Sequence, residues 1–161
     1  MSMILVSGAS WFGSGLRSIS SVLEEMVMNA KSEILIGVYS IGSIDDALFF
    51  YLTDSLNHGV NLVMFINRYR RQPEWARDYF ERLRAGHSRV IVYSVECPEG
   101  EDFHAKVFVV DRSKAIIGSA NLSQKGFTYN YEMGVYVEGI LADEAAGALE
   151  RLVINGVARK I

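Results

Sequence analysis

The stretch from His104 to Asn121, HAKVFVVDRSKAIIGSAN, constrains the fold of this 161-residue chain more than any other. Two apolar runs of strand length flank the polar turn signal DRSK, a pattern that predicts a β-hairpin. A two-residue loop at 112–113 would place Lys106 opposite Ser119 and His104 opposite Asn121. Residues directly opposite each other point to the same face of a sheet. The sequence therefore predicts one polar patch on one side of the hairpin.

Composition predicts a globular protein, since half of the residues are hydrophobic and 22% are charged. The length suits one domain with a sizeable core, which we expect to span residues 1–161. No apolar run reaches the about 18 residues that cross a membrane, and the N-terminus lacks the features of a secretion signal. The one cysteine, Cys97, excludes an internal disulfide. We expect a cytoplasmic protein without membrane insertion.

Strand and helix patterns alternate along the chain. Continuous apolar runs at 33–40, 60–67 and 89–95 predict buried strands, and further strands are expected at 3–6 and 129–137. Helical spacing of apolar residues predicts helices at 19–30, 43–57, 73–86 and 142–154. Ser43 is expected to cap the second of these, with Asp45 and Asp46 in its first turn. Together with the hairpin, this order predicts an α/β fold with a mixed, mostly parallel β-sheet and helices on both faces.

The four polar residues of the predicted patch suit phosphate chemistry. His104 has a side chain that acts as nucleophile or general acid near neutral pH. Lys106 adds a cationic donor, and Ser119 and Asn121 add neutral donors. Such a set is suited to binding a tetrahedral anion, of which phosphate is the commonest.

Three further residues are candidates for supporting roles. Asn130 or Glu132 is expected to hold the second ring nitrogen of His104 and fix its tautomer. Asp111 is expected at the far end of the hairpin, opposite Lys114, where it supports the turn and does not touch the phosphate. The sequence shows no carboxylate cluster for magnesium, and its three histidines are not at zinc spacing. We therefore expect chemistry that needs neither a metal nor another cofactor.

Six residues match, in type and spacing, the HKD signature of the phospholipase D superfamily: His104, Lys106, Asp111, Gly118, Ser119 and Asn121. Glu132, eleven positions after Asn121, resembles the acidic residue that follows the motif in the bacterial nucleases of that family. The order of strands and helices from about residue 19 to 154 is similar to the single-motif unit of the family. The resemblance thus covers most of the chain and implies a phospholipase D-like sandwich.

The resemblance also implies a two-step mechanism, in which a histidine attacks phosphorus and water later displaces it from the phosphohistidine. In-line displacement needs a proton donor on the opposite side of phosphorus. The chain holds one HxK motif, since neither His58 nor His87 is followed two residues later by lysine. The second histidine must come from another copy. We therefore expect a homodimer in which the two His104 residues act as nucleophile and acid.

The substrate class stays open. The single-motif unit resembles the small dimeric endonucleases of the family, and seven arginines between residues 68 and 89 favour DNA or RNA. Those arginines otherwise form a solvated helix face. The net charge of −3 and the acidic loop 96–102 oppose tight binding of a polyanion. One alternative is a phospholipid hydrolase. Another is a catalytically weak nucleic-acid-binding module of a larger restriction or defence system, in which a partner protein or a missing domain supplies sequence specificity.

Overall fold

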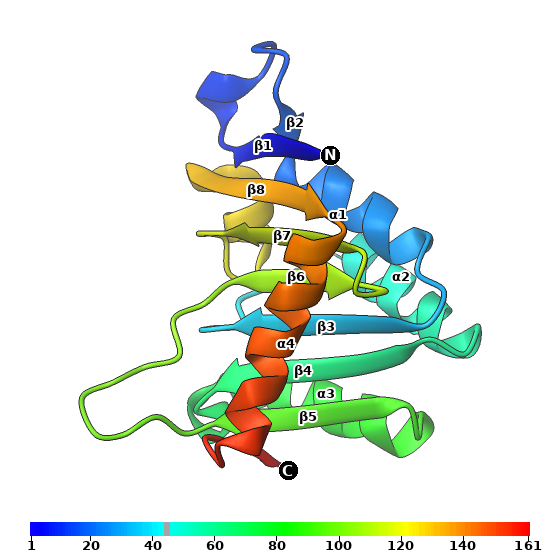
Figure 1. Cartoon of the computed structure of the whole chain (residues 1–161), viewed down its shortest axis with the longest axis vertical. Helices are drawn as coiled ribbons and strands as arrows, with labels where there is room; N and C mark the ends of the chain where they lie inside the picture. The colour runs from blue at the N-terminus through cyan, green and yellow to red at the C-terminus, as the bar shows by residue number, and fades with distance from the viewer. Residues whose placement is uncertain (44–45) are drawn as a thin grey trace.

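The structure is a computed structural model that describes residues 1–43 and 46–161. Within these residues nine strands form one sheet in the order β2-β1-β8-β7-β6-β3-β4-β5-β9 (Figure 1). The strands are β1 (Ser2–Ser7), β2 (Arg17–Ser18), β3 (Glu33–Val38), β4 (Asn61–Asn67), β5 (Val90–Val95), β6 (Val107–Val110), β7 (Lys114–Gly118), β8 (Glu132–Glu138) and β9 (Ala158–Lys160). The helices are α1 (Ile19–Met28), α2 (Asp46–Asn57), α3 (Glu74–Gly86) and α4 (Ile140–Ile154). Short helical turns are η1 (Ala9–Trp11), η2 (Tyr69–Arg71) and η3 (Lys125–Tyr129).

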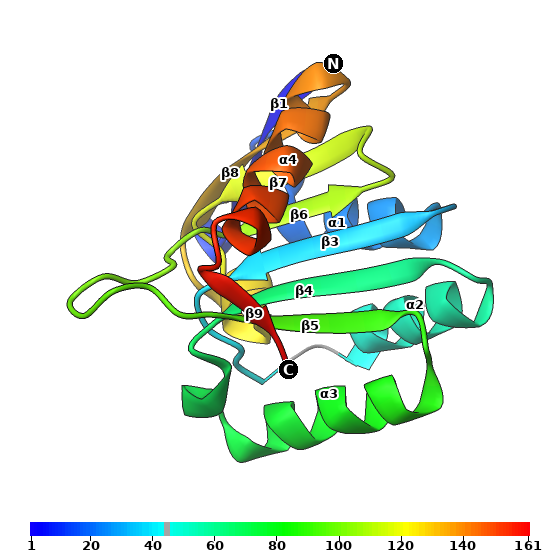
Figure 2. The ribbon, with the colours of Figure 1, turned by 60° about the horizontal axis from the view of Figure 1, so that its bottom comes forward.

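Helices cover both faces of the sheet, which confirms the predicted α/β class. Helices α1, α2 and α3 pack on one face through residues such as Val27, Leu52 and Phe80. Helix α4 crosses the other face at a slant and buries Leu149 against Leu35 and its neighbours (Figures 1 and 2). The two cores thus share one sheet, whose central strands are apolar on both sides, as their continuous hydrophobic runs predict.

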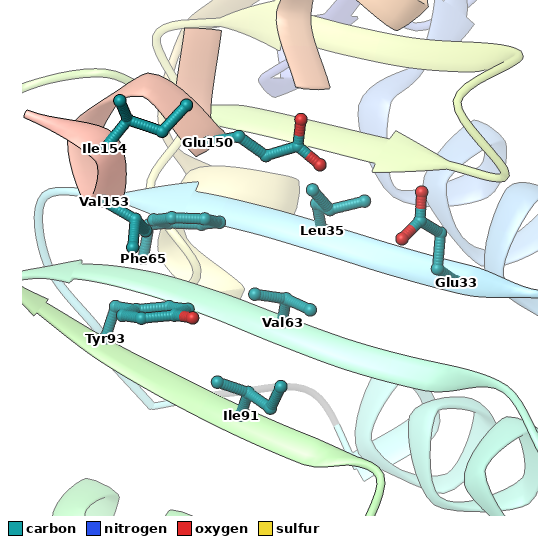
Figure 3. Close-up of a pocket in the computed structure, with 9 residues that line it drawn as sticks. All are labelled: Glu33, Leu35, Val63, Phe65, Ile91, Tyr93, Glu150, Val153 and Ile154. Carbon is teal, nitrogen blue, oxygen red and sulfur yellow. The ribbon is translucent and has the colours of Figure 1, made fainter. Parts of the chain in front are cut away.

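Because α4 crosses at a slant, it leaves part of that face of the sheet uncovered. An apolar hollow of about 300 Å³ opens between α4 and strands β3, β4 and β5, with Leu35, Val63 and Tyr93 on its floor (Figure 3). Glu33 and Glu150 lie at one end of the hollow (Figure 3). None of its lining residues belongs to the predicted polar patch. The phosphate chemistry predicted from the sequence therefore has to be sought elsewhere on the sheet.

The expectation of a mostly parallel sheet is wrong. Three strand pairs are parallel, namely β1–β2, β3–β4 and β4–β5. Five pairs are antiparallel: β1–β8, β3–β6, β5–β9, β6–β7 and β7–β8. The parallel block is the predicted run of strand–helix–strand units. The sheet as a whole is mixed because the hairpin joins β3 antiparallel, β8 and β1 extend the hairpin antiparallel, and β9 joins β5 antiparallel.

The hairpin forms, but its expected register is wrong by one position. Val110 pairs with Lys114, which leaves a three-residue loop instead of the two-residue loop. Gly118, and not Ser119, therefore lies opposite Lys106, and its amide donates to the Lys106 carbonyl at 3.1 Å. Strand β7 ends at Gly118, so Ser119 lies beyond the ladder and does not follow its alternation.

Other differences are local. The strand expected at 129–137 begins at Glu132, because residues 125–129 form the π-helical turn η3. The cap expected for α2 includes Asp45, which lies outside the described residues, so that cap stays a prediction. In the described part of the chain, no helix has the length and apolar character needed to cross a membrane.

Candidate active site

All the predicted site residues except Asp111 gather at one edge of the sheet. This edge carries the carboxyl ends of β3, β4 and β7 and the starts of β6 and β8, at the left of Figure 1. Loops that leave the carboxyl ends of neighbouring parallel strands bring distant segments together, which is why open α/β sheets bind ligands there. The fold therefore assembles a site from segments near residues 39, 67, 104, 119 and 132.

The backbone immediately before His104 is anchored. The ring of Phe103 packs over Gly37, where an added Cβ would lie 3.1 Å from that ring. The Phe103 amide donates to the Asn67 side chain at 3.0 Å. The His104 ring itself is exposed and lies 4.6 Å, between centroids, from the ring of Tyr39. The histidine is thus held in place while its ring stays accessible to substrate.

Lys106 is a buried cation directly beside this histidine. Its side chain is 5% exposed, and its Nζ donates to His104 Nδ1 at 2.8 Å and to the His104 carbonyl at 2.7 Å. Nζ also lies 5.4 Å from the centroid of the Tyr39 ring, within range of a cation–π interaction. Burial lowers the pKa of Lys106, and the negative charge of Glu132 opposes that shift. The ammonium group is therefore poised to exchange its His104 acceptors for phosphate oxygens.

Ser119 and Glu132 form a second part of the site, next to His104 and Lys106. The Ser119 hydroxyl donates to the Glu132 carboxylate, and Asn130 donates to the same carboxylate at 3.3 Å. Ser119 is fixed further because its hydroxyl accepts from the Met133 amide at 3.1 Å. Among the described residues, neither Glu132 nor Asn130 hydrogen-bonds to His104. The structure thus brings Glu132 into the site, but onto Ser119 and not onto the histidine ring.

Asn121 closes the site from the side of β3. Its Oδ1 accepts from the Ser40 amide at 3.2 Å, which fixes the orientation of the side-chain amide. The neighbouring backbone is fixed by Gln72, a buried side chain that accepts from the Ile41 amide at 3.0 Å and donates to the Tyr39 carbonyl at 3.1 Å. The segment that carries Tyr39 and Ser40 is therefore rigid before any ligand binds.

Asp111 lies at the far end of the hairpin from His104. Its carboxylate accepts from the backbone amides of Lys31, Ser32 and Glu33 at 2.7–3.2 Å and from the Ser32 hydroxyl at 2.7 Å. Burial raises the pKa of Asp111, but these hydrogen bonds together outweigh that effect and hold it below its usual value. Asp111 thus ties the hairpin turn to the start of β3, in place of the expected contact with Lys114.

The acidic loop 96–102 docks beside the site through Arg68. Arg68 donates to Asp102 at 3.2 Å and to the Glu101 carbonyl at 2.9 Å. Asn67 also donates to Asp102, at 3.2 Å. The hydrogen bonds from Asn67 and Arg68 lower the pKa of the Asp102 carboxyl. The loop therefore enters the site with part of its negative charge neutralised.

The remaining predicted features separate in space. Arg71 lines a hollow beside Tyr39, whereas Arg70, Arg77 and Arg84 line a second hollow between α3 and β9. The arginine-rich stretch is therefore not one patch. In the ranges 1–43 and 46–161, no three or more His, Cys, Asp or Glu side chains cluster closely enough to hold a metal ion.

Sequence reasoning missed Tyr39, Asn67 and Gln72. Tyr39 touches the histidine ring, Asn67 holds the backbone before it, and Gln72 fixes the segment around Tyr39. The positions of Tyr39 and Asn67 could have been recognised from the sequence. Both lie at the carboxyl ends of predicted strands, and parallel strands of one sheet meet there at a common edge. Gln72 gave no such signal.

Comparison with known proteins identifies the family of this chain. A family model described as "Cardiolipin synthase, PLD-like domain" matches residues 23–153. The DISARM protein DrmC of Bacillus paralicheniformis is 33% identical over 149 residues, which cover 91% of this chain and 60% of that protein. The chain therefore spans about three fifths of the length of this relative.

Two solved structures share the fold over nearly their whole length. Nuc of Salmonella typhimurium, described as a phospholipase D family member, superposes with a TM-score of 0.74 at 16% identity and covers 100% of this chain and 99% of its own. NucT from Helicobacter pylori superposes with a TM-score of 0.76 at 14% identity and the same coverage. At such identities the likeness shows the fold, and the site has to be argued from its own residues.

Proposed function

Because the chain belongs to the phospholipase D superfamily, we propose that it is a metal-independent phosphodiesterase that hydrolyses DNA or RNA through a phosphohistidine on His104. We further propose that it acts in the cytoplasm as a single domain and as a homodimer. The contact that carries this proposal is the hydrogen bond of 2.8 Å between the buried ammonium of Lys106 and the ring of His104. It joins a nucleophile and a phosphate-binding cation at the exposed edge of the sheet.

The chemistry follows from the donors around His104. Phosphate oxygens accept hydrogen bonds from Lys106, Ser119 and the Asn121 amide. They replace the His104 acceptors of Lys106 and the Glu132 acceptor of the Ser119 hydroxyl. The freed ring nitrogen attacks phosphorus while the bond to the leaving oxygen breaks. The second His104 protonates that oxygen. Water then attacks the phosphohistidine, gives its proton to the second His104, and releases the first as a neutral imidazole.

Exposed apolar residues on the face of the sheet that α4 covers support the homodimer. Ile4 and Ile117 both pair with Val135, and Met133 shares their face of the sheet because it is two residues away on β8. These side chains are 46%, 38% and 51% exposed for Ile4, Ile117 and Met133. Met133 adjoins Glu132 and Ile117 adjoins Gly118 in the chain, so this apolar exposure reaches the edge that carries the half-complete site and favours a second copy docked there.

Two alternatives have specific support. The description of the matching family model names cardiolipin synthase, which favours a phospholipid hydrolase. DISARM protein DrmC is longer than this chain, which favours a weakly catalytic nucleic-acid module of a larger restriction or defence system with a partner protein. A substrate panel of single- and double-stranded DNA, RNA and cardiolipin vesicles separates the three.

The first test removes the nucleophile. His104→Asn should abolish hydrolysis of bis(p-nitrophenyl) phosphate, and EDTA should leave the wild-type rate intact. His58→Asn is the matched control, since His58 is exposed at the end of α2 and bonds to the carbonyl of Asp54. Activity that survives His104→Asn would refute the assignment, and strict metal dependence would refute the proposed chemistry.

The second test addresses the shared site. Wild-type chains are mixed with His104→Asn chains and allowed to exchange subunits. A site built from both His104 residues gives activity that falls as the square of the wild-type fraction, because mixed dimers lack either nucleophile or acid. Activity that falls in direct proportion to that fraction would show that each chain is complete alone.

A further inference from the structure

A hollow of about 300 Å³ lies next to the proposed site, at the ends of β3 and β4. Tyr39 and Ser40 form one side of it, Asn67 and Arg68 another, and Arg71 lies at its rim. Tyr39 is shared with the site, because its ring also lies 4.6 Å from the ring of His104. A group bound in this hollow would therefore be the immediate neighbour of the phosphate held by Lys106.

The walls of the hollow are preformed. Gln72 bridges the ends of β3 and β4, since its Nε2 donates to the Tyr39 carbonyl at 3.1 Å and to the Asn67 carbonyl at 2.7 Å. Gln72 is buried, so these hydrogen bonds are shielded from water. A preformed hollow costs little ordering when a ligand enters it.

The two arginines that line the hollow differ in their partners. Arg68 is engaged with Asp102 and with the carbonyl of Glu101. Asp102 is in turn held by Arg68 and Asn67. Arg71 is exposed, and its guanidinium has no hydrogen-bond or ion-pair partner in the described ranges 1–43 and 46–161. Asp102 also lines the hollow and attracts Arg71 at longer range, so the hollow carries two arginines and one carboxylate, a net charge of +1. The guanidinium of Arg71 keeps a fork of donors suited to two phosphate oxygens.

We propose that Arg71 and this hollow bind the phosphate next to the scissile phosphate, so that the enzyme prefers a polynucleotide to an isolated phosphodiester. This inference rests on the proposed hydrolysis of nucleic acid and adds a second phosphate-binding position beside the scissile phosphate. A strand of nucleic acid repeats its phosphates at regular spacing, whereas a dinucleoside monophosphate has a single one. Arg71 is therefore a specificity-determining residue that acts outside the reacting atoms.

The experiment compares two substrates in wild-type protein and in Arg71→Gln. The ratio of kcat/KM for a short single-stranded oligonucleotide to kcat/KM for a dinucleoside monophosphate should fall about tenfold in Arg71→Gln, the value of one charge-assisted contact. The salt dependence of oligonucleotide cleavage should lose about 0.7 of its logarithmic slope, the share of one phosphate contact. Arg151→Gln is the matched control, because Arg151 is an exposed arginine on α4, across the sheet, and should leave the ratio unchanged.

Each other result has a distinct meaning. An unchanged ratio in Arg71→Gln overturns the subsite. An equal loss on both substrates also overturns it, since Arg71 would then act on the reacting centre itself. Wild-type protein that cleaves bis(p-nitrophenyl) phosphate or cardiolipin but no oligonucleotide refutes the subsite and leaves the phosphodiesterase intact. Wild-type protein inactive on every phosphodiester refutes the proposed function instead.

Discussion

Replacing Asp111 with asparagine should destabilise the fold by about 2 kcal/mol while leaving the chemical step nearly intact. In the structure, Oδ1 of Asp111 accepts from the amides of Ser32 and Glu33 and from the Ser32 hydroxyl, and Oδ2 accepts from the Lys31 amide at 2.9 Å. Asparagine retains an oxygen for the first three donors. It places an NH₂ group against the Lys31 amide, so that one hydrogen bond and the negative charge are lost.

The magnitude follows from that geometry. A net hydrogen bond to a charged group contributes about 1.5–3 kcal/mol, and the partial exposure of Asp111 puts the expected loss near the lower half of that range. Backbone strain adds little, because the φ of Asp111 is 51° and asparagine tolerates the left-handed region as well as aspartate does. Alanine at this position would lose all four acceptor contacts and add strain.

The loss of stability in Asp111→Asn should be larger at neutral pH than at acidic pH. The folded-state pKa of Asp111 is lowered, so its contribution is fully present above the unfolded value of about 3.9 and is lost as pH falls through the folded pKa. Wild type and Asp111→Asn should therefore differ most near neutral pH. Their free energies of unfolding should converge as the solution is acidified below about pH 4.

The assay combines urea unfolding with turnover of bis(p-nitrophenyl) phosphate at a temperature where both proteins are folded. Asp143→Asn is the control, because Asp143 carries an exposed carboxylate that pairs with Arg112 at 2.6 Å and should cost less than about 1 kcal/mol. A large loss of turnover in Asp111→Asn with unchanged stability would refute the support role. It would show that Asp111 takes part in the chemistry despite its distance from His104 along the hairpin.

Two further predictions concern the site itself. Gly118→Ala should destabilise the protein by at least about 2 kcal/mol and reduce turnover, because its Cβ would lie 2.6 Å from the Met133 carbonyl oxygen and 2.7 Å from Gly134 Cα, both backbone atoms. Gly147→Ala is its control: nothing lies within 4 Å of that Cβ, so it should stabilise α4 by up to about 1 kcal/mol. Unfolding curves that coincide for Gly118→Ala and wild type would contradict this. The alkaline limb of kcat/KM should fall below the usual lysine value of about 10.4, since burial lowers the pKa of Lys106, and a limb at or above that value would contradict the assignment of Lys106.

Much of the fold was predictable because its central strands are buried on both faces. Continuous apolar runs located β3, β4 and β5, whose pattern reports burial directly. The edge strands β2 and β9 were not predicted, since each is two or three residues long and contains exposed polar side chains. Their pairing depends on neighbours far away in the sequence, and no local pattern encodes it.

The sequence identified the right site residues although the predicted register of the hairpin was wrong. The structure explains why. His104 precedes β6 and Asn121 follows β7, so both lie outside the ladder that the register describes. Their positions are set by contacts with Tyr39 and Ser40, which come from a different part of the chain. Sequence spacing thus identified the residue types, while the geometry required side-chain contacts that span tens of residues.

The negative net charge of the chain argues against a nucleic-acid substrate, but the charges are unevenly placed. The overall charge is −3, yet Arg112 gathers Glu33, Asp143 and Glu150 at the end of the hairpin away from His104. Salt at physiological strength screens charges beyond about 8 Å, so these distant carboxylates have little influence at the site edge.

At that edge the acidic loop is partly neutralised by Arg68, through Asp102 at 3.2 Å and Glu96 at 4.0 Å. Lys106 and Arg71 then remain to face an incoming phosphodiester chain. A phosphodiester chain is therefore attracted by these two cations on a protein whose total charge is negative, and its rate of association should fall as salt rises.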